Sequence, residues 1–449
     1  MRKAKYRNRR RRQFFIVFLV VFVLVLTAAA GYVFFKGSSG THDNGSGLNT
    51  SAASNAGNSR GAQVPTAPTV STETSIANQK TPKPGEATDP IKEKLATMSL
   101  DEKLGQMVIV GLDGYKTDSH AVQMIKNRHV GGFILFKNNI QNSNQMLDLL
   151  NSLKKENQVN QVPLFLSVDE EGGRISRLPD EFLKFPTNQT IGQMNNSSLS
   201  YTVGSIIGEE LKSFGMNMDF APVLDINSNP QNPVIGDRSF GSEPVIVTKL
   251  GVQTMKGLQS QNIISVIKHF PGHGDTSVDS HVGLPIVNNG LQRLRSFELK
   301  PFAAAVENGA EVVMVAHILL PKIDPKNPAS FSKTIISDIL RRDMNYDGVV
   351  ITDDFTMGAI IKNYNIGQAA VKSILAGSDI VLVCHGFDKQ EEVIAALKNA
   401  AQTGKLTMNR IDQSVYRILK LKNKHNITDS PAEAVNSKAI NDKIKALFK

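Results

Sequence analysis

The chain has 449 residues, and its formal net charge of +10 at pH 7 is concentrated at one end. Eight of its Lys and Arg residues lie within the first twelve positions, so the rest of the chain carries about +2 (10 − 8). We therefore predict no nucleic-acid partner, because such binding needs a basic patch on the folded part of the protein. The single cysteine, Cys384, excludes an intramolecular disulfide, and its apolar neighbours favour a buried position.

The first 35 residues have the pattern of a membrane anchor. Residues 1–13 are basic, and residues 14–35 contain no charged side chain. A helix of that length crosses a hydrocarbon core of about 30 Å. The positive-inside rule places residues 1–13 in the cytoplasm, so we predict a single-pass protein of the cell membrane whose remaining chain lies outside. The alternative is a signal peptide cut near the small residues 28–30, which would give a secreted protein.

Residues 36–88 are predicted to form a flexible linker. Positions 37–88 contain no Phe, Tyr or Trp and are rich in Gly, Ser, Thr, Asn, Ala and Pro. Such a composition buries too little apolar surface to offset the loss of chain entropy on folding. We interpret this segment as a tether between the membrane and a folded domain.

Residues 89–425 alternate between short apolar runs and amphipathic helical segments. Continuous apolar runs are typical of strands that are covered on both faces. Eight such units predict an α/β fold, a TIM-type (β/α)8 barrel, and residues 426–449 are predicted to be a polar C-terminal tail. The predicted strands are 106–112, 131–136, 163–169, 216–222, 264–270, 312–318, 348–353 and 379–384, and the clearest helices are 143–155, 200–214, 248–259 and 392–402.

Polar residues stand at the end of several predicted strands. The side chains that carry chemistry in this type of barrel gather at the carboxyl ends of the strands. Ordinary solvated charges would lie on helix faces instead, so we predict a functional site at this end of the barrel. The residues concerned are Asp169, Lys268, His269, His317, Asp353 and His385.

The richest of these segments is Lys268–His281, which contains three histidines and two aspartates. Asp279 precedes His281 by two residues, and a carboxylate that accepts the Nδ1 proton of an imidazole leaves Nε2 free for proton transfer. We predict acid/base chemistry for this pair, in a loop that Gly272 and Gly274 help to fold over the site. A metal site is the rival interpretation, but Pro271 and Gly272 interrupt the spacing of the histidines, so no metal and no cofactor are predicted.

Three further segments supply candidate nucleophilic and sugar-binding groups. Asp353 and Asp354 are adjacent at the end of one strand, where only one of them can face the barrel mouth, and we favour Asp353 as a nucleophile. Carboxylates and guanidinium groups hold sugar hydroxyls by hydrogen bonds of fixed geometry. Asp169, Arg177 and Arg238 are the candidates for that role.

These motifs together resemble glycoside hydrolase family 3, in particular its bacterial β-N-acetylglucosaminidase branch. The resemblance covers about residues 90–424, and its most specific part is Lys-His-Phe-Pro-Gly-His-Gly at 268–274 followed by Asp-Ser-His at 279–281. It implies that His281 is the proton donor and acceptor, with Asp279 as its partner, and that Asp353 forms a covalent glycosyl-enzyme. It further implies sugar contacts from Asp169, Arg177, Arg238, Lys268 and His269. Asp237 stands where relatives commonly have Glu.

The resemblance implies a retaining, exo-acting β-N-acetylhexosaminidase that releases terminal β-linked N-acetylglucosamine from cell-wall muropeptides or chitin-type fragments. We expect a monomer whose partners are this glycan and, through the N-terminal helix, the membrane. A β-glucosidase of the same family is one alternative, although such enzymes typically take their acid/base from a second domain. A catalytically silent wall-binding module is another. Phosphorolysis also stays open, because an imidazole does not repel a phosphate acceptor.

Overall fold

The computed structural model describes residues 89–449. The predicted basic segment (1–13), membrane helix (14–35) and linker (36–88) lie outside the described residues. No helix within residues 89–449 is long and apolar enough to cross a membrane.

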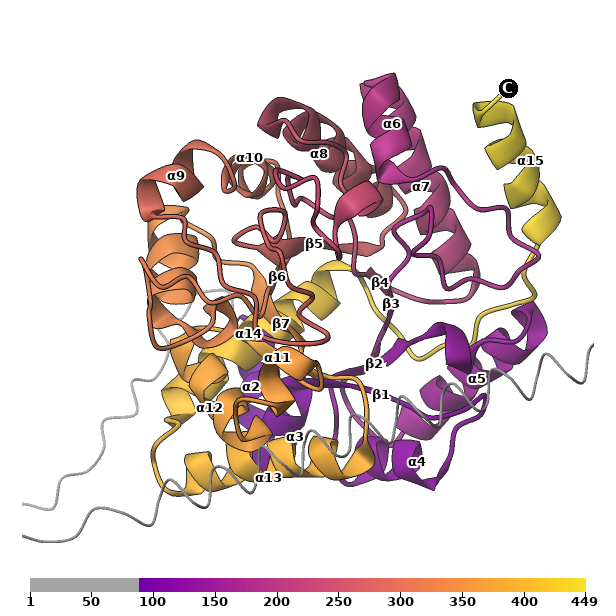
Figure 1. Ribbon diagram of the computed structural model, residues 1–449. Helices are drawn as coiled ribbons and strands as arrows, with labels where there is room; N and C mark the ends of the chain where they lie inside the picture. The colour runs from indigo at the N-terminus through magenta and orange to yellow at the C-terminus, as the bar shows by residue number, and fades with distance from the viewer. Residues whose placement is uncertain (1–88) are drawn as a thin grey trace, which may run out of the picture. The chain divides into compact units, whose positions relative to one another are not determined.

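Eight parallel strands form a closed barrel in which neighbours in sequence are neighbours in space and β8 pairs with β1. The strands lie inside a ring of helices (Figure 1). The predicted (β/α)8 barrel is therefore confirmed. The strands are β1 (Val108–Gly111), β2 (Gly132–Leu135), β3 (Phe165–Val168), β4 (Met218–Asp219), β5 (Ile264–Phe270), β6 (Val312–Val315), β7 (Val349–Asp354) and β8 (Ile380–Val383).

Most strands are shorter than their apolar runs. Every residue of β1, β2, β3 and β8 is buried, which explains why the runs lack the alternation of a half-exposed strand. The largest difference is β4, which was predicted to span 216–222 and has only two residues in the ladder. Pro222 has no N–H to donate, and pairing with β5 resumes only through a single bridge from Val223 to Lys268.

The helices cover the outside of the barrel. The predicted helical segments 143–155, 200–214, 248–259 and 392–402 correspond to α5, α7, α8 and α13. The longer helices are α2 (Pro90–Thr97), α4 (Ser119–Lys126), α5 (Ser143–Asn157), α7 (Ser197–Ser213), α8 (Pro244–Ser260), α10 (Lys300–Glu307), η4 (Thr334–Asp343), α12 (Ile366–Ala376), α13 (Phe387–Gln402), α14 (Met408–Lys424) and α15 (Ser437–Leu447). The shorter ones are α3 (Leu100–Gln106), η1 (Lys137–Asn139), α6 (Asn188–Met194), η2 (Gly236–Arg238), α9 (Leu291–Ser296), η3 (Ala329–Phe331) and α11 (Gly358–Ile361).

A buried cluster of charges fixes the amino-terminal end of β8. The Oδ2 atom of Asp379 accepts hydrogen bonds from Arg341 at 2.5 Å and from the backbone of Val350 at 3.0 Å. Its Oδ1 atom accepts one from Ser414 at 2.7 Å and lies 3.5 Å from a guanidinium nitrogen of Arg417. Arg410, also on α14, has a guanidinium nitrogen 3.6 Å from Oδ1. We call Asp379, Arg341, Arg410 and Arg417 the basal cluster.

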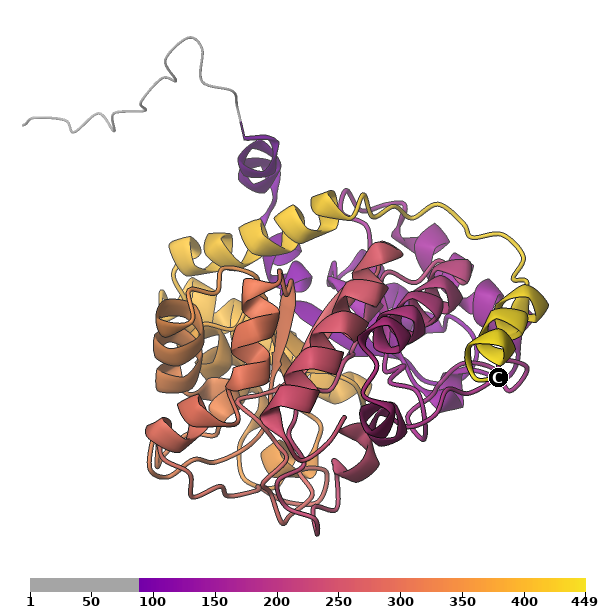
Figure 2. The same cartoon turned by 90° about the horizontal axis from the view of Figure 1, so that it is seen from above.

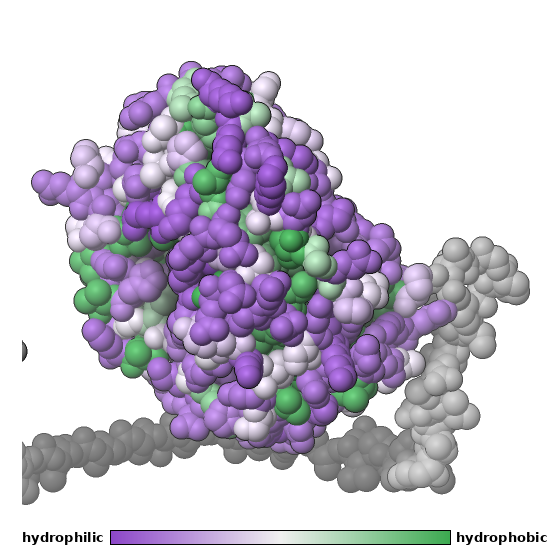
Figure 3. Space-filling view, turned by 90° about the vertical axis from the view of Figure 1, so that its right-hand side faces the viewer, coloured by the Kyte–Doolittle hydropathy of each residue, from purple (hydrophilic) through white to green (hydrophobic). Residues whose placement is uncertain are grey.

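Residues 426–449 are not merely a polar tail, and this prediction needs correction. The connection from α14 leads across the domain to α15 (Figure 2). Ile440 and Ile444, one turn apart on α15, are buried, and α15 contacts α7. The apolar residues lie four positions apart among many Lys and Asn residues, so a narrow apolar stripe was hidden by a polar composition. The face of the domain that carries α15 is mainly hydrophilic, with separate small apolar groups (Figure 3).

Candidate active site

The carboxyl ends of the strands surround a cavity of about 450 Å³, part of it open to solvent. Six of the predicted site residues line it, and they come from positions far apart in the sequence. Parallel strands that close into a barrel bring their ends together, which explains this convergence. The lining residues are Asp169, Val234, Arg238, Lys268, His269, His273, Ser280, His281, Met314, Asp353 and Leu382.

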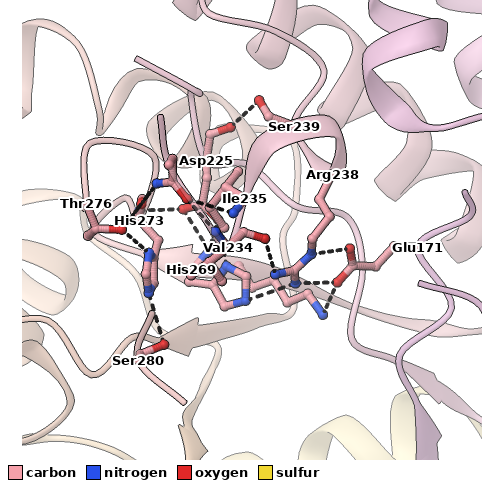
Figure 4. A network of polar contacts seen from close by, with 12 residues as sticks. Glu171, Asp225, Val234, Ile235, Arg238, Ser239, His269, His273, Thr276 and Ser280 are labelled. Atoms are coloured by element: carbon pink, nitrogen blue, oxygen red, sulfur yellow. Dashed lines mark hydrogen bonds and ion pairs between the residues drawn. The ribbon is translucent and has the colours of Figure 1, made fainter. Parts of the chain in front are cut away.

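A buried charge network forms one wall of the cavity. Glu171 accepts two parallel hydrogen bonds from Arg238, at 2.7 and 2.8 Å (Figure 4). The ammonium group of Lys268 lies 2.7 Å from Glu171 and 2.5 Å from Asp169. Burial disfavours the charged form of Glu171, but Arg238 and Lys268 outweigh it and hold the pKa of this carboxyl far below its usual range. We call Asp169, Glu171, Arg238 and Lys268 the upper cluster.

His269 is oriented by Asp225, which is completely buried. Its Nδ1 atom lies 2.6 Å from Asp225, and because a carboxylate only accepts, Nδ1 donates. Its Nε2 atom lies 3.5 Å from a guanidinium nitrogen of Arg238. Burial opposes the ionisation of Asp225, but its charge and hydrogen-bond interactions with His269 lower the pKa of the carboxyl overall. The imidazole therefore presents a fixed edge to the cavity.

His273 holds the following loop together. Its Nδ1 atom lies 2.8 Å from the hydroxyl of Thr276, and its Nε2 atom lies 3.1 Å from the hydroxyl of Ser280 (Figure 4). Burial, reinforced by the nearby imidazole of His269, lowers the pKa of His273 to about 4. This side chain is therefore neutral near pH 7, and its hydrogen bonds fix the loop beside the catalytic candidates.

Asp279 and His281 form the predicted pair. The Nδ1 atom and the backbone N–H of His281 both lie 2.8 Å from the same oxygen of Asp279. The His281 side chain is 64% exposed, which leaves its Nε2 edge accessible. Partial burial opposes the ionisation of Asp279, but the hydrogen bonds from His281 lower its pKa. The carboxylate thus stays available as the acceptor that fixes the tautomer of the imidazole.

Asp353 and Asp354 have different surroundings, as the alternation of an extended strand predicts. Asp353 lines the cavity. Asp354 accepts hydrogen bonds from the backbone of Thr356 at 2.8 Å and of Cys384 at 2.9 Å, so it fixes the turn after β7. Burial raises the pKa of Asp353, but the imidazoles of His269 and His317 and the N–H of Asp354 bring it below its usual value. Asp353 is therefore an ionised carboxylate at the cavity wall.

Arg177 is placed differently from the other candidates, because it does not line this cavity. Its backbone N–H donates to Glu170 at 2.7 Å, and its Nε atom is buried without a hydrogen-bond partner among residues 89–449. Burial raises the pKa of Glu170 to about 7, against the hydrogen bonds that it accepts from Arg177 and its neighbours. An unsatisfied buried donor costs free energy, so this nitrogen is a candidate contact for a bound molecule.

Two residues that organise the site, Glu171 and Asp225, were not among the predicted site residues. In an extended segment, residues two apart point the same way, so Asp169 already indicated Glu171 as its neighbour on the cavity side. Asp225 directly follows the apolar run 220–224, the same signal that marked the other strand ends. It was missed because the predicted fourth strand ended at Pro222. Within residues 89–449, no group of three or more His, Cys, Asp or Glu is arranged to hold a metal ion.

Comparison with known families decides the classification. Residues 99–421 match the model of the glycosyl hydrolase family 3 N terminal domain. The chain belongs to glycosyl hydrolase family 3. The resemblance inferred from the residues at 268–281 is thereby confirmed, and the match extends over all eight strands of the barrel.

This family 3 protein is similar to two curated β-hexosaminidases. It is 37% identical to β-hexosaminidase A of Pseudoalteromonas piscicida over 326 residues, which are 67% of this chain and 54% of that protein. The chain thus spans about half the length of that relative. It is 34% identical to a β-hexosaminidase of Nitrosomonas eutropha over 314 residues, which are 68% of this chain and 88% of that protein.

A solved structure gives the same classification. The family 3 β-N-acetylglucosaminidase of Paenibacillus sp. FPU-7 superposes with a TM-score of 0.75 at 38% identity. The superposition covers 78% of this chain and 68% of that chain.

Proposed function

We propose that this protein is a retaining, exo-acting β-N-acetylhexosaminidase. The observation that carries the proposal is that Asp353 and His281 line one cavity, beside a buried wall of charged groups. The names of the similar proteins support the same reaction and the same sugar. An anionic carboxylate and an imidazole with a fixed tautomer are the two groups that a covalent double displacement needs.

The proposed reaction has two steps. In the first, Nε2 of His281 gives a proton to the glycosidic oxygen while a carboxylate oxygen of Asp353 attacks the anomeric carbon. The bond to the leaving oxygen breaks, and a glycosyl ester forms on Asp353. In the second step His281 takes a proton from water, the water oxygen attacks the anomeric carbon, and the ester bond breaks. Two inversions leave the configuration of the sugar unchanged.

The upper cluster holds the sugar in this proposal. Asp169 is 18% exposed, so its free oxygen can accept from sugar hydroxyl groups, while Lys268 and Arg238 present donors from a fixed frame. His269 adds the imidazole edge that Asp225 orients. Arg177 does not line the cavity, so its proposed sugar contact rests on the family resemblance.

The test is hydrolysis by the full-length protein of matched fluorogenic β-glycosides. We expect the N-acetylglucosaminide to be cleaved much faster than the glucoside, with release of the β-anomer as the first product. Faster cleavage of the glucoside would make the protein a β-glucosidase, and no cleavage of either would favour a silent binding module. Sugar phosphate formed only when phosphate is present would replace hydrolysis by phosphorolysis.

We further propose where the enzyme acts. Residues 14–35 would anchor it in the cell membrane with residues 1–13 in the cytoplasm, and residues 36–88 would tether the barrel outside, close to cell-wall muropeptides. External protease should then release an active barrel domain from intact cells, and purified wall fragments should yield free N-acetylglucosamine. Protection from external protease would contradict this topology, and the absence of free sugar would contradict the substrate.

A further inference from the structure

The loop that carries Asp279 and His281 packs against α11, the short helix that follows β7. The backbone N–H of Gly358 donates to the carbonyl of His281 at 3.2 Å, and the N–H of Ala359 donates to the carbonyl of Ser280 at 3.0 Å. The first N–H groups of a helix have no partner within the helix, so this loop satisfies two of them. The loop and the helix are thus joined by their backbones, directly at the catalytic histidine candidate.

Gly358 has no space for a side chain. A Cβ atom built on it would lie 2.5 Å from the carbonyl oxygen of His281 and 3.0 Å from the backbone of Val282. These are backbone atoms, which cannot rotate away as the end of a side chain can. Any residue other than glycine at this position must therefore push the loop away from α11.

The same helix is fixed to the nucleophile candidate on its other side. Asp354 accepts hydrogen bonds from Thr356 in the turn and from Cys384 after β8, and its carbonyl accepts from the N–H of Met357 at 3.1 Å. Four residues, 354–357, therefore lie between Asp353 and Gly358, the glycine against which the loop packs. By contrast, the ring of His281 is 64% exposed, and Asp279 is its hydrogen-bond partner among the described residues.

We propose that Gly358 is a positioning residue, which sets the distance between the imidazole of His281 and the carboxylate of Asp353 by allowing the loop to lie directly on α11. This inference rests on the proposed function, because it takes His281 as the proton donor to the leaving oxygen. A displacement of the loop by about 1 Å misplaces that donor, and such misplacement costs on the order of 100-fold in rate. Binding of the sugar to the upper cluster is left intact.

The experiment compares two N-acetyl-β-glucosaminides that differ in their leaving group. A dinitrophenolate leaves without taking up a proton, whereas an alkyl alcohol needs a proton in order to leave. The readout is kcat/KM, which reports the first, bond-breaking step. For Gly358→Ala we expect a loss of about 100-fold with the alkyl substrate and little change with the dinitrophenyl substrate, at an unchanged melting temperature.

Gly283→Ala is the matched control. This glycine lies in the same loop, but a Cβ atom on it would meet only a methyl group of Val278, at 3.7 Å, which is ordinary contact. We expect wild-type kcat/KM on both substrates. If Gly358→Ala does not fold, Lys362→Ala is the second test variant. Lys362 donates to the carbonyl of Val282 at 2.7 Å, so its removal should lower kcat/KM on the alkyl substrate selectively, by a smaller factor.

The outcomes separate the two claims. A loss that is equal on both substrates, or no loss at all, would overturn the positioning role while an active wild-type enzyme still supports the proposed function. A wild-type protein that cleaves neither substrate would overturn the proposed function and this inference with it.

Discussion

The barrel has buried charge clusters at its two ends, and they are built for different purposes. In the basal cluster both oxygens of Asp379 are saturated by hydrogen bonds, and the groups that make them belong to η4, β7 and α14. In the upper cluster Glu171 is equally buried, but its neighbour Asp169 is 18% exposed at the cavity. A saturated cluster can only hold the fold together, whereas one with a free oxygen at a cavity can also bind a ligand.

The largest expected effect is on stability, from Asp379→Asn in the basal cluster. The substitution leaves three arginines around a neutral amide, and removing one partner from a buried ion pair costs about 3–5 kcal/mol. Chemical denaturation should show this decrease in the free energy of unfolding. The kcat/KM of the protein that remains folded should be unchanged, and a selective loss of activity would contradict the structural role.

The opposite pattern is expected for Asp169→Asn in the upper cluster. Lys268 keeps Glu171 as its partner and Asp169 is partly exposed, so the free energy of unfolding should fall by less than it does for Asp379→Asn. The substitution replaces a carboxylate, which accepts charge-assisted hydrogen bonds from sugar hydroxyl groups, by a neutral amide. We expect the loss of these bonds to lower kcat/KM on the order of 100-fold. Activity close to wild type would remove Asp169 from the sugar-binding set.

A smaller effect is expected in the dependence of stability on pH, which tests the contribution of Asp379. The carboxyls of Asp379 and Glu171 both have folded-state pKa values below their usual ones, Asp379 because its three arginines outweigh the cost of burial. Their contribution is therefore complete above about pH 4.5 and is lost as the pH falls through the folded-state values. The melting temperature of the wild type should fall steeply below pH 4, and that of Asp379→Asn less steeply. Parallel curves would show that Asp379 does not contribute to acid lability.

The smallest effect concerns α15, which lies outside both clusters. Asn441 donates to the carbonyl of Glu181 at 2.7 Å and accepts from the N–H of Leu183 at 2.8 Å, so it ties the segment after β3 to the last helix. Both contacts are exposed, and Asn441→Ala should cost about 1 kcal/mol or less of unfolding free energy. Lys438→Ala, which removes only an exposed i,i+4 pair, is the control. A loss for the control as large as that for Asn441→Ala would show that the contacts of Asn441 do not stabilise the position of α15.

The sequence predicted the parts of this molecule that follow from local pattern. All eight strands were located because covered parallel strands leave uninterrupted apolar runs. Asp169, Lys268, His269 and Asp353 were found because a strand end in a barrel has a known direction. Asp279 and His281 were found because two residues of spacing bring a carboxylate to an imidazole, which the 2.8 Å contact confirms.

The remaining features depend on contacts between distant segments, which a local pattern does not record. Asp225 reaches His269 across 44 positions, and Glu171 meets Arg238 across 67. The contact between the loop and Gly358 could not be predicted either, because a glycine in a sequence does not show which segment packs against it. The polar composition of residues 426–449 concealed α15, since two buried isoleucines are enough to dock a short helix.

The covalent bond that we propose between Asp353 and the sugar can be tested by trapping. A 5-fluoro N-acetylglucosaminyl fluoride has a leaving group that needs no proton, and its ring fluorine slows both steps, so the ester should accumulate. Intact-mass measurement should show one added sugar, and peptide mapping should place it on Asp353, with no adduct on Asp353→Ala. Turnover without an adduct, or an adduct on Asp354 or another residue, would show that Asp353 is not the nucleophile.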